Sequence, residues 1–125
     1  MKTSLNALHH QGNDWLRELE FYKDELALLT TRLEEVASKN TDKDVLAQVE
    51  HFQNKFVLLR QQIDELKHDV NKRNSDVTEL SKDKPTHVTE NYVNANSKLQ
   101  NGMLGLVQSI ATTRFEFNEF LSKTL

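Results

Sequence analysis

An unbroken apolar stripe between residues 45 and 70 restricts this chain to a helical fold more strictly than any other feature of the sequence. Apolar residues recur there at alternating steps of four and three positions. This spacing is the heptad pattern of helices that pack along one another. It predicts one long helix whose inner side carries no ionisable group and must be covered by other helices. The stripe consists of Val45, Val49, Phe52, Phe56, Leu59, Ile63, Leu66 and Val70.

The composition agrees with a few long helices. Of the 125 residues, 37 % are hydrophobic and 28 % are charged, which suits helices that bury one stripe and expose the rest. A single proline and three glycines leave few places for breaks. We therefore expect one all-α domain: a bundle of three long antiparallel helices (up-down-up) with coiled-coil-like heptad packing, associating as a dimer.

Helix boundaries are predicted from the polar segments between the apolar stripes. Gly12-Asn13-Asp14 is typical of a helix start, and Asp83-Lys84-Pro85-Thr86 is the clearest break. Between the first two helices, Asn40 is expected to be left-handed and Thr41 to form a capping box with Asp44. The resulting division is a polar N-terminal arm over 1–12 and a single bundle domain over 13–125, with helices at about 14–39, 42–81 and 86–123.

The first helix is too short to cover the other two along their whole length. The segment 67–100 is therefore expected to project as a polar helical hairpin, which is a candidate docking surface for another protein. Either the N-terminal arm or a second chain could cover it. Its cations, among them Lys72 and Arg73, are interspersed with Asp69 and Asp76, which predicts a solvated face and no anion site.

Trp15 is expected beside two glycines of the third helix. In an antiparallel arrangement it lies roughly level with Asn101, so Gly102 and Gly105 would leave room for its indole ring or let the third helix approach its neighbours closely. Arg114, at the margin of the same helix, is expected to form a surface ion pair with Glu116 or Glu119.

Surplus apolar side chains in the middle of the bundle predict self-association. A three-helix bundle buries roughly two positions of each heptad and one flanking position. Additional apolar residues exceed that need, and exposed patches of this kind often mark interfaces. The interface candidates are Phe21, Leu28, Val57 and Leu58.

Motifs that would carry chemistry are sparse. Glu65 and His68 match half of a ferritin-like Glu-x-x-His pair, but the heptad places both away from the seam and no second pair follows. His9 and His10 lie in the arm, and His51 also falls off the seam. We expect no catalytic residue, no cofactor and no metal site.

Charge and hydropathy narrow the classes of partner. The net charge of −3, with mixed signs, provides no basic face for nucleic acid. No stretch has the ~20 apolar residues of a membrane span or the apolar run of a signal peptide, so a cytoplasmic protein is expected.

The expected function is that of a non-enzymatic helical scaffold or adaptor acting through protein–protein association. The alternative is a metal-binding (ferritin-like) or other small-ligand-binding bundle.

Overall fold

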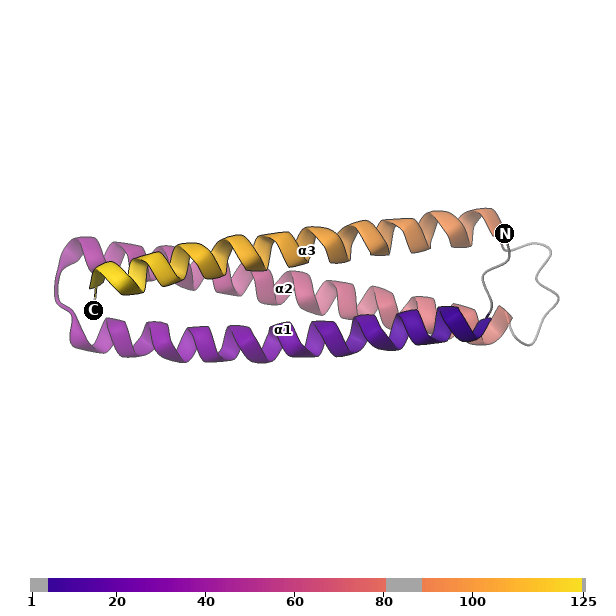
Figure 1. Ribbon diagram of the computed structural model, residues 1–125, viewed down its shortest axis with the longest axis horizontal. Helices are drawn as coiled ribbons and strands as arrows, with labels where there is room; N and C mark the ends of the chain where they lie inside the picture. The colour runs from indigo at the N-terminus through magenta and orange to yellow at the C-terminus, as the bar shows by residue number, and fades with distance from the viewer. Residues whose placement is uncertain (1–4, 81–88, 125) are drawn as a thin grey trace.

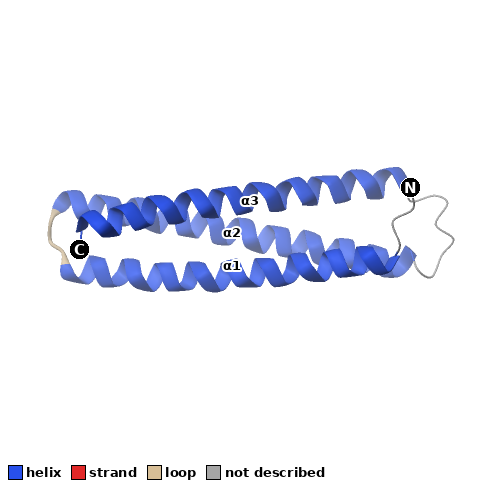
Figure 2. Cartoon of the chain, viewed as in Figure 1, coloured by secondary structure: helices blue, strands red, loops and turns tan. Residues whose placement is uncertain are grey.

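Three long helices run side by side along the described part of the molecule (Figure 1). The computed structural model describes residues 5–80 and 89–124. Helices α1 (Leu5–Lys39) and α3 (Thr89–Thr124) run in the same direction, and α2 (Lys43–Leu80) runs in the opposite direction between them in the sequence. Figure 2 shows only helix and one short loop in the described part of the chain, which confirms the predicted all-α three-helix bundle.

Two side chains cap the short connection between α1 and α2. The Asn40 side-chain amide donates to the Val36 carbonyl oxygen at 2.8 Å, and the Asp42 carboxylate accepts from the backbone N–H groups two and three residues ahead. The cap of α2 is therefore Asp42, and the predicted capping box at Thr41 is wrong. Asn40 is not left-handed either, because no described non-glycine residue has a positive φ.

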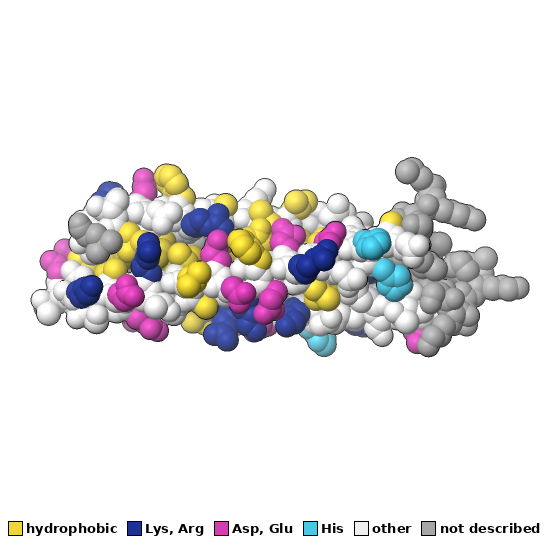
Figure 3. Space-filling model, turned by 60° about the horizontal axis from the view of Figure 1, so that its bottom comes forward, with side chains coloured by type: hydrophobic (Ala, Val, Ile, Leu, Met, Phe, Trp, Pro, Cys, Tyr) yellow, Lys and Arg dark blue, Asp and Glu magenta, His cyan; other side chains and the backbone are white. Residues whose placement is uncertain are grey.

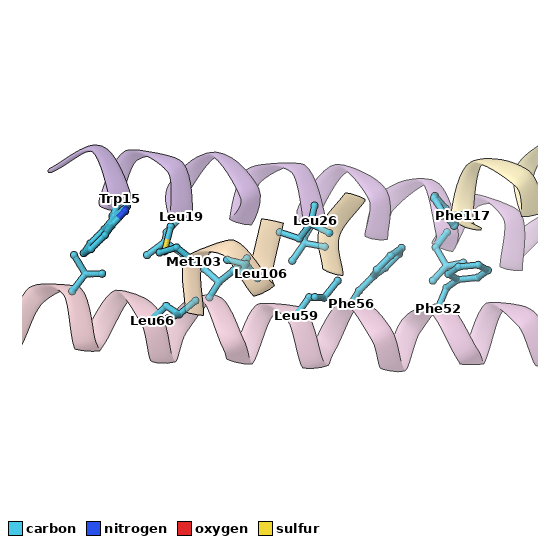
Figure 4. Packing of buried hydrophobic residues seen from close by; sticks show 14 of the residues in the cluster. Trp15, Leu19, Leu26, Phe52, Phe56, Leu59, Leu66, Met103, Leu106 and Phe117 are labelled. Atoms are coloured by element: carbon cyan, nitrogen blue, oxygen red, sulfur yellow. The ribbon is translucent and has the colours of Figure 1, made fainter. Parts of the chain in front are cut away.

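The core is a column of apolar side chains along the inner faces of all three helices (Figure 4). Every residue of the predicted stripe from Val49 to Val70 is buried, and Val45 is partly buried. Near the connection between α1 and α2 the column becomes aromatic. Phe117 of α3 is fully buried, with its ring centroid 5.2 Å from that of Phe52 and 5.3 Å from that of Phe56. Edge-to-face contacts of this kind add to the stabilisation from burial.

The first helix begins earlier than the sequence predicted. Residues 5–12, which the sequence assigns to the N-terminal arm, are regular helix and continuous with the rest of α1. They lie against the end of the hairpin that was expected to project, because Leu8 and Gln11 both accept hydrogen bonds from Arg73 of α2. The hairpin is thus covered at this position by its own chain, while residues 1–4 and 81–88 lie outside the described residues.

The glycines of α3 do not accommodate Trp15. A Cβ atom at Gly102 would meet only a Leu66 methyl group within 4 Å, and one at Gly105 would meet nothing. The predicted pairing of the indole with these glycines is therefore wrong. Gly102 gives room to the leucine of α2, while Trp15 packs on Arg73, with its ring centroid 5.2 Å from the guanidinium carbon.

Alanine substitutions should separate the roles of two glycines. Gly105→Ala is expected to raise the free energy of unfolding by about 0.5–1 kcal/mol, because its Cβ enters open space and alanine favours helix. Gly12→Ala is expected to lower the free energy of unfolding, although alanine favours helix here too. Its Cβ would overlap the Asn74 amide oxygen and lie 2.6 Å from a guanidinium nitrogen of Arg73. Urea denaturation of both variants measures the difference. Equal stabilisation by the two substitutions would contradict the close packing at Gly12.

Candidate functional site

The most unusual group of side chains surrounds Arg73 near one end of the bundle. Although charged, Arg73 is only 3 % exposed. Its Nε donates to the Asn96 side-chain oxygen of α3 at 3.0 Å. Its Nη1 donates to the Leu8 carbonyl oxygen at 2.6 Å, and its Nη2 donates to the Gln11 side-chain oxygen at 2.7 Å, both in α1. One guanidinium therefore links all three helices.

The charge of Arg73 is balanced by dipoles. Among the described residues, the oxygens that accept hydrogen bonds from Arg73 all belong to amides, either of the backbone or of side chains. The Trp15 ring adds a cation–π contact. Burial of an unpaired charge costs several kcal/mol unless hydrogen bonds replace water. The planar fork of arginine, with five N–H donors, suits such replacement better than a lysine ammonium would.

Sequence reasoning placed Arg73 on a solvated face, which is wrong. The residue occupies an inward position of the heptad, and a signal in the sequence could have revealed its partners. From Trp15 backward, Gly12, Leu8 and Leu5 follow at the heptad steps of three and four, as on the inward-facing side of a helix. Heptad spacing that extends this far predicts that these residues are helical. It therefore also predicts that they pack against the end of the hairpin.

The interior is consequently not wholly apolar. The inner side of the second helix is predicted to carry no ionisable group, but Arg73 of α2 lies on it. The network nevertheless lacks the groups of an acid–base or nucleophilic site, because its described members are amides, one guanidinium and an indole. Its arrangement holds helices in place and offers no described reacting group.

A second polar link joins α1 to α3 in the middle of the molecule. Arg114 donates from Nε and Nη2 to one carboxylate oxygen of Glu25, at 3.1 and 2.5 Å. The partner of Arg114 is thus Glu25 of α1 and not the predicted Glu116 or Glu119. Arg114 leans inward from α3 and faces α1. Beside this pair, burial and the Glu18 carboxylate raise the pKa of the Tyr22 phenol, which donates to Glu18 at 3.3 Å.

The residues considered for metal binding lie apart on the surface. Glu65 and His68 are both exposed on α2. His10 and His51 are exposed as well, and they belong to different helices. Within residues 5–80 and 89–124, no three histidine or carboxylate side chains come together as metal ligands would.

The interface candidates are exposed, but they do not share one face. Phe21 and Leu28 lie seven residues apart on α1, on either side of Glu25 in the sequence, and are 61 % and 73 % exposed. Since Glu25 pairs with Arg114, both flank the contact between α1 and α3. Leu58 instead lines a shallow groove between α2 and α3, and Val57 is 100° further around α2. Both are also more than half exposed.

Two exposed hydrophobic residues of α3 were missed by the sequence reasoning. Leu104 and Phe115 are 57 % and 64 % exposed and lie eleven residues, or three helical turns, apart on one side of α3. Arg114, adjacent to Phe115, pairs with Glu25 of α1, and Val107, close to Leu104, lies two turns from Arg114 on the same side of α3, so both exposed residues border the same contact as Phe21. We call these four side chains the α1–α3 face; it consists of Phe21, Leu28, Leu104 and Phe115. Hydrophobic side chains are visible among charged ones along the side on which α1 comes forward (Figure 3).

The groove between α2 and α3 is the clearest concave feature near the glycines. It has a volume of about 480 Å³ and runs beside Gly105, where the absence of a side chain deepens it. Its lining is mixed: Leu58 and Leu59 on α2 face the hydroxyl groups of Ser109 and Thr112 on α3. It holds no cluster of convergent charged groups that would fix a ligand.

Comparisons with protein-family models, with curated proteins and with solved structures found no match. The contacts of this chain are therefore the basis for a functional assignment. One further finding concerns the described helices: none combines the length and apolarity needed to cross a membrane.

Proposed function

We propose that this protein is a non-enzymatic helical scaffold or adaptor of the cytoplasm that acts through protein–protein association, with a dimer as its basic unit. The observation that carries the proposal is the exposure of large hydrophobic side chains on a bundle whose core is already filled. Phe21, Leu28, Leu104 and Phe115 all remain more than half exposed. Apolar surface of this kind on a helical protein is often covered by a partner.

The same features argue against the ligand-binding alternative. The large side chains of the interior pack on one another, and the buried charged side chain of Arg73 is used to join helices. A coiled-coil-like arrangement of the three helices would make the bundle a rigid rod that presents its surface to other chains. Its polar end around 67–100 remains a proposed contact for a different protein.

Light scattering on the purified chain tests association. The expected mass is twice 14.5 kDa at tens of micromolar, with dissociation on dilution. A matched variant carries serine at Phe21, Leu28, Val57 and Leu58 and should be monomeric with unchanged helicity, because all four side chains are exposed in the single chain. A monomeric natural sequence at this concentration would overturn the proposed dimer.

A further inference from the structure

We infer that a second copy of this chain packs antiparallel on the part of the α1–α3 face formed by Phe21, Leu28 and Phe115, about a two-fold axis that passes beside the Glu25–Arg114 pair. This inference rests on the proposed self-association and specifies its geometry. In a two-fold interface, a residue that contacts a given position of the partner is itself contacted by the equivalent residue. The face must therefore be complementary to itself in one orientation, and α1 meets that condition.

The apolar and charged residues of α1 are arranged symmetrically about Glu25. Phe21 lies four residues before it and Leu28 three residues after it, on one side of the helix. In an antiparallel pair centred there, Phe21 faces the partner's Leu28 and Leu28 faces the partner's Phe21. Further out, Glu18 faces the partner's Arg32 and Arg32 faces the partner's Glu18. Hydrophobic residues thus meet at the centre and opposite charges meet at the edges.

Helix α3 supports the same axis. Because Arg114 pairs with Glu25, the adjacent Phe115 lies at the level of the axis and comes close to the partner's Phe115. Glu25 approaches the partner's Glu25, but each carboxylate is already neutralised by its own Arg114. Leu104 lies ten residues from Arg114, or about 15 Å along the helix, so it falls outside the contact.

A parallel dimer would not match the surface in this way. Rotation about the long axis of the bundle places α1 against the partner's α3 at unchanged height. The Glu25–Arg114 pair sets Phe21 level with position 110 of α3. Phe21 would then miss the partner's Leu104 and the partner's Phe115 by five or six residues each, about 7–9 Å. The antiparallel arrangement is therefore the one that covers both Phe21 and Leu28.

Disulfide cross-linking tests the orientation directly, since the natural chain has no cysteine. In the double variant Phe21→Cys/Leu28→Cys, the two thiols of one chain are about 10.5 Å apart along the helix and cannot join each other. In the antiparallel dimer each faces the other position of the partner. Mild oxidation should yield a covalent dimer about a hundredfold faster than random collision allows, because the effective concentration is millimolar.

The single variants are the matched controls. Phe21→Cys alone and Leu28→Cys alone should remain largely uncross-linked, because each thiol lies about 10 Å from its equivalent in the partner. Rapid cross-linking of either single variant would mean that the same position of the two chains meets, which the antiparallel arrangement does not allow, and would overturn the inference. Rapid cross-linking of Val57→Cys or Leu58→Cys, without that of the double variant, would place the interface on another face and overturn it as well.

Charge reversal provides a second, independent test. Glu18→Arg and Arg32→Glu are each expected to raise the dimer dissociation constant about fivefold, and the double variant should return within twofold of the natural chain. Glu20→Arg is the control, because Glu20 pairs with Lys67 of its own chain at 3.7 Å, away from this face. If the dimer of the double variant loses as much affinity as the two single variants lose together, the pairing of Glu18 with the partner's Arg32 is contradicted.

The outcomes separate the inference from the proposed function. A dimer by light scattering that shows neither the cross-link nor the charge rescue would retain the proposed function and overturn this interface. A chain that is monomeric at all concentrations tested would overturn both, and would leave the α1–α3 face to a protein of different sequence.

Discussion

Replacing Phe117 with alanine is expected to lower the free energy of unfolding by about 3–5 kcal/mol. The ring is fully buried and packs within 5.2–6.2 Å, between centroids, of the rings of Phe52, Phe56 and Phe120. Its removal leaves a cavity among side chains of two helices that cannot close around it without moving the backbone. Denaturation by urea, followed by circular dichroism, measures the loss.

Leu104→Ala is the control for that experiment. Leu104 lies on the same helix, is more than half exposed and falls outside the proposed dimer contact. Its substitution should change stability by no more than about 0.5 kcal/mol. A comparable loss at both positions would mean that α3 packs on its neighbours through a different side.

Replacing Arg73 with alanine is expected to cost about 2–4 kcal/mol, with the loss concentrated at one end of the bundle. The variant would remove the hydrogen bonds that Arg73 donates to the oxygens of Leu8, Gln11 and Asn96, and it would remove the support of the Trp15 ring. Hydrogen exchange should show lost protection for backbone amides of residues 5–13, while the aromatic part of the core keeps its protection.

Two further variants make this prediction specific. Arg73→Lys keeps the charge but loses the planar fork, so it should also be destabilising. Lys72→Ala removes an exposed cation one residue away and should leave the free energy of unfolding unchanged. Stability unchanged in Arg73→Lys would mean that charge alone, and not the pattern of hydrogen bonds, holds α1 at this end.

The architecture could be predicted from the sequence because heptad spacing is a local property that survives in the fold. The stripe from Val49 to Val70 is buried as expected, and the start of α2 was predicted to within one residue, while its predicted end at 81 lies outside the described residues. The start of α1 was missed because Gly12 resembled a helix break. In the structure Gly12 is the position at which the helix must lack a side chain, so that α1 can lie against Asn74 and Arg73.

The polar contacts were harder to predict, since they depend on which residues of different helices lie at the same height. Arg114 had acidic neighbours on its own helix, yet it pairs with Glu25, which is 89 residues away in the sequence. Trp15 was assigned to glycines of α3, but a guanidinium on α2 provides its contact. An error of one turn in the alignment of two helices, about 5.4 Å, exchanges one partner for another.

The Arg73 network also determines the axial register of α1. A heptad seam tolerates a slip of seven residues, because the slip again sets apolar side chains against apolar side chains. The network does not tolerate it: a slip of one heptad would carry Leu8, Gln11 and Gly12 about 10 Å away and leave the guanidinium without acceptors from α1. A buried polar contact that is satisfied in only one alignment selects that alignment among otherwise similar ones. The apolar column stabilises the bundle, and one arginine specifies the axial position of α1 relative to α2 and α3.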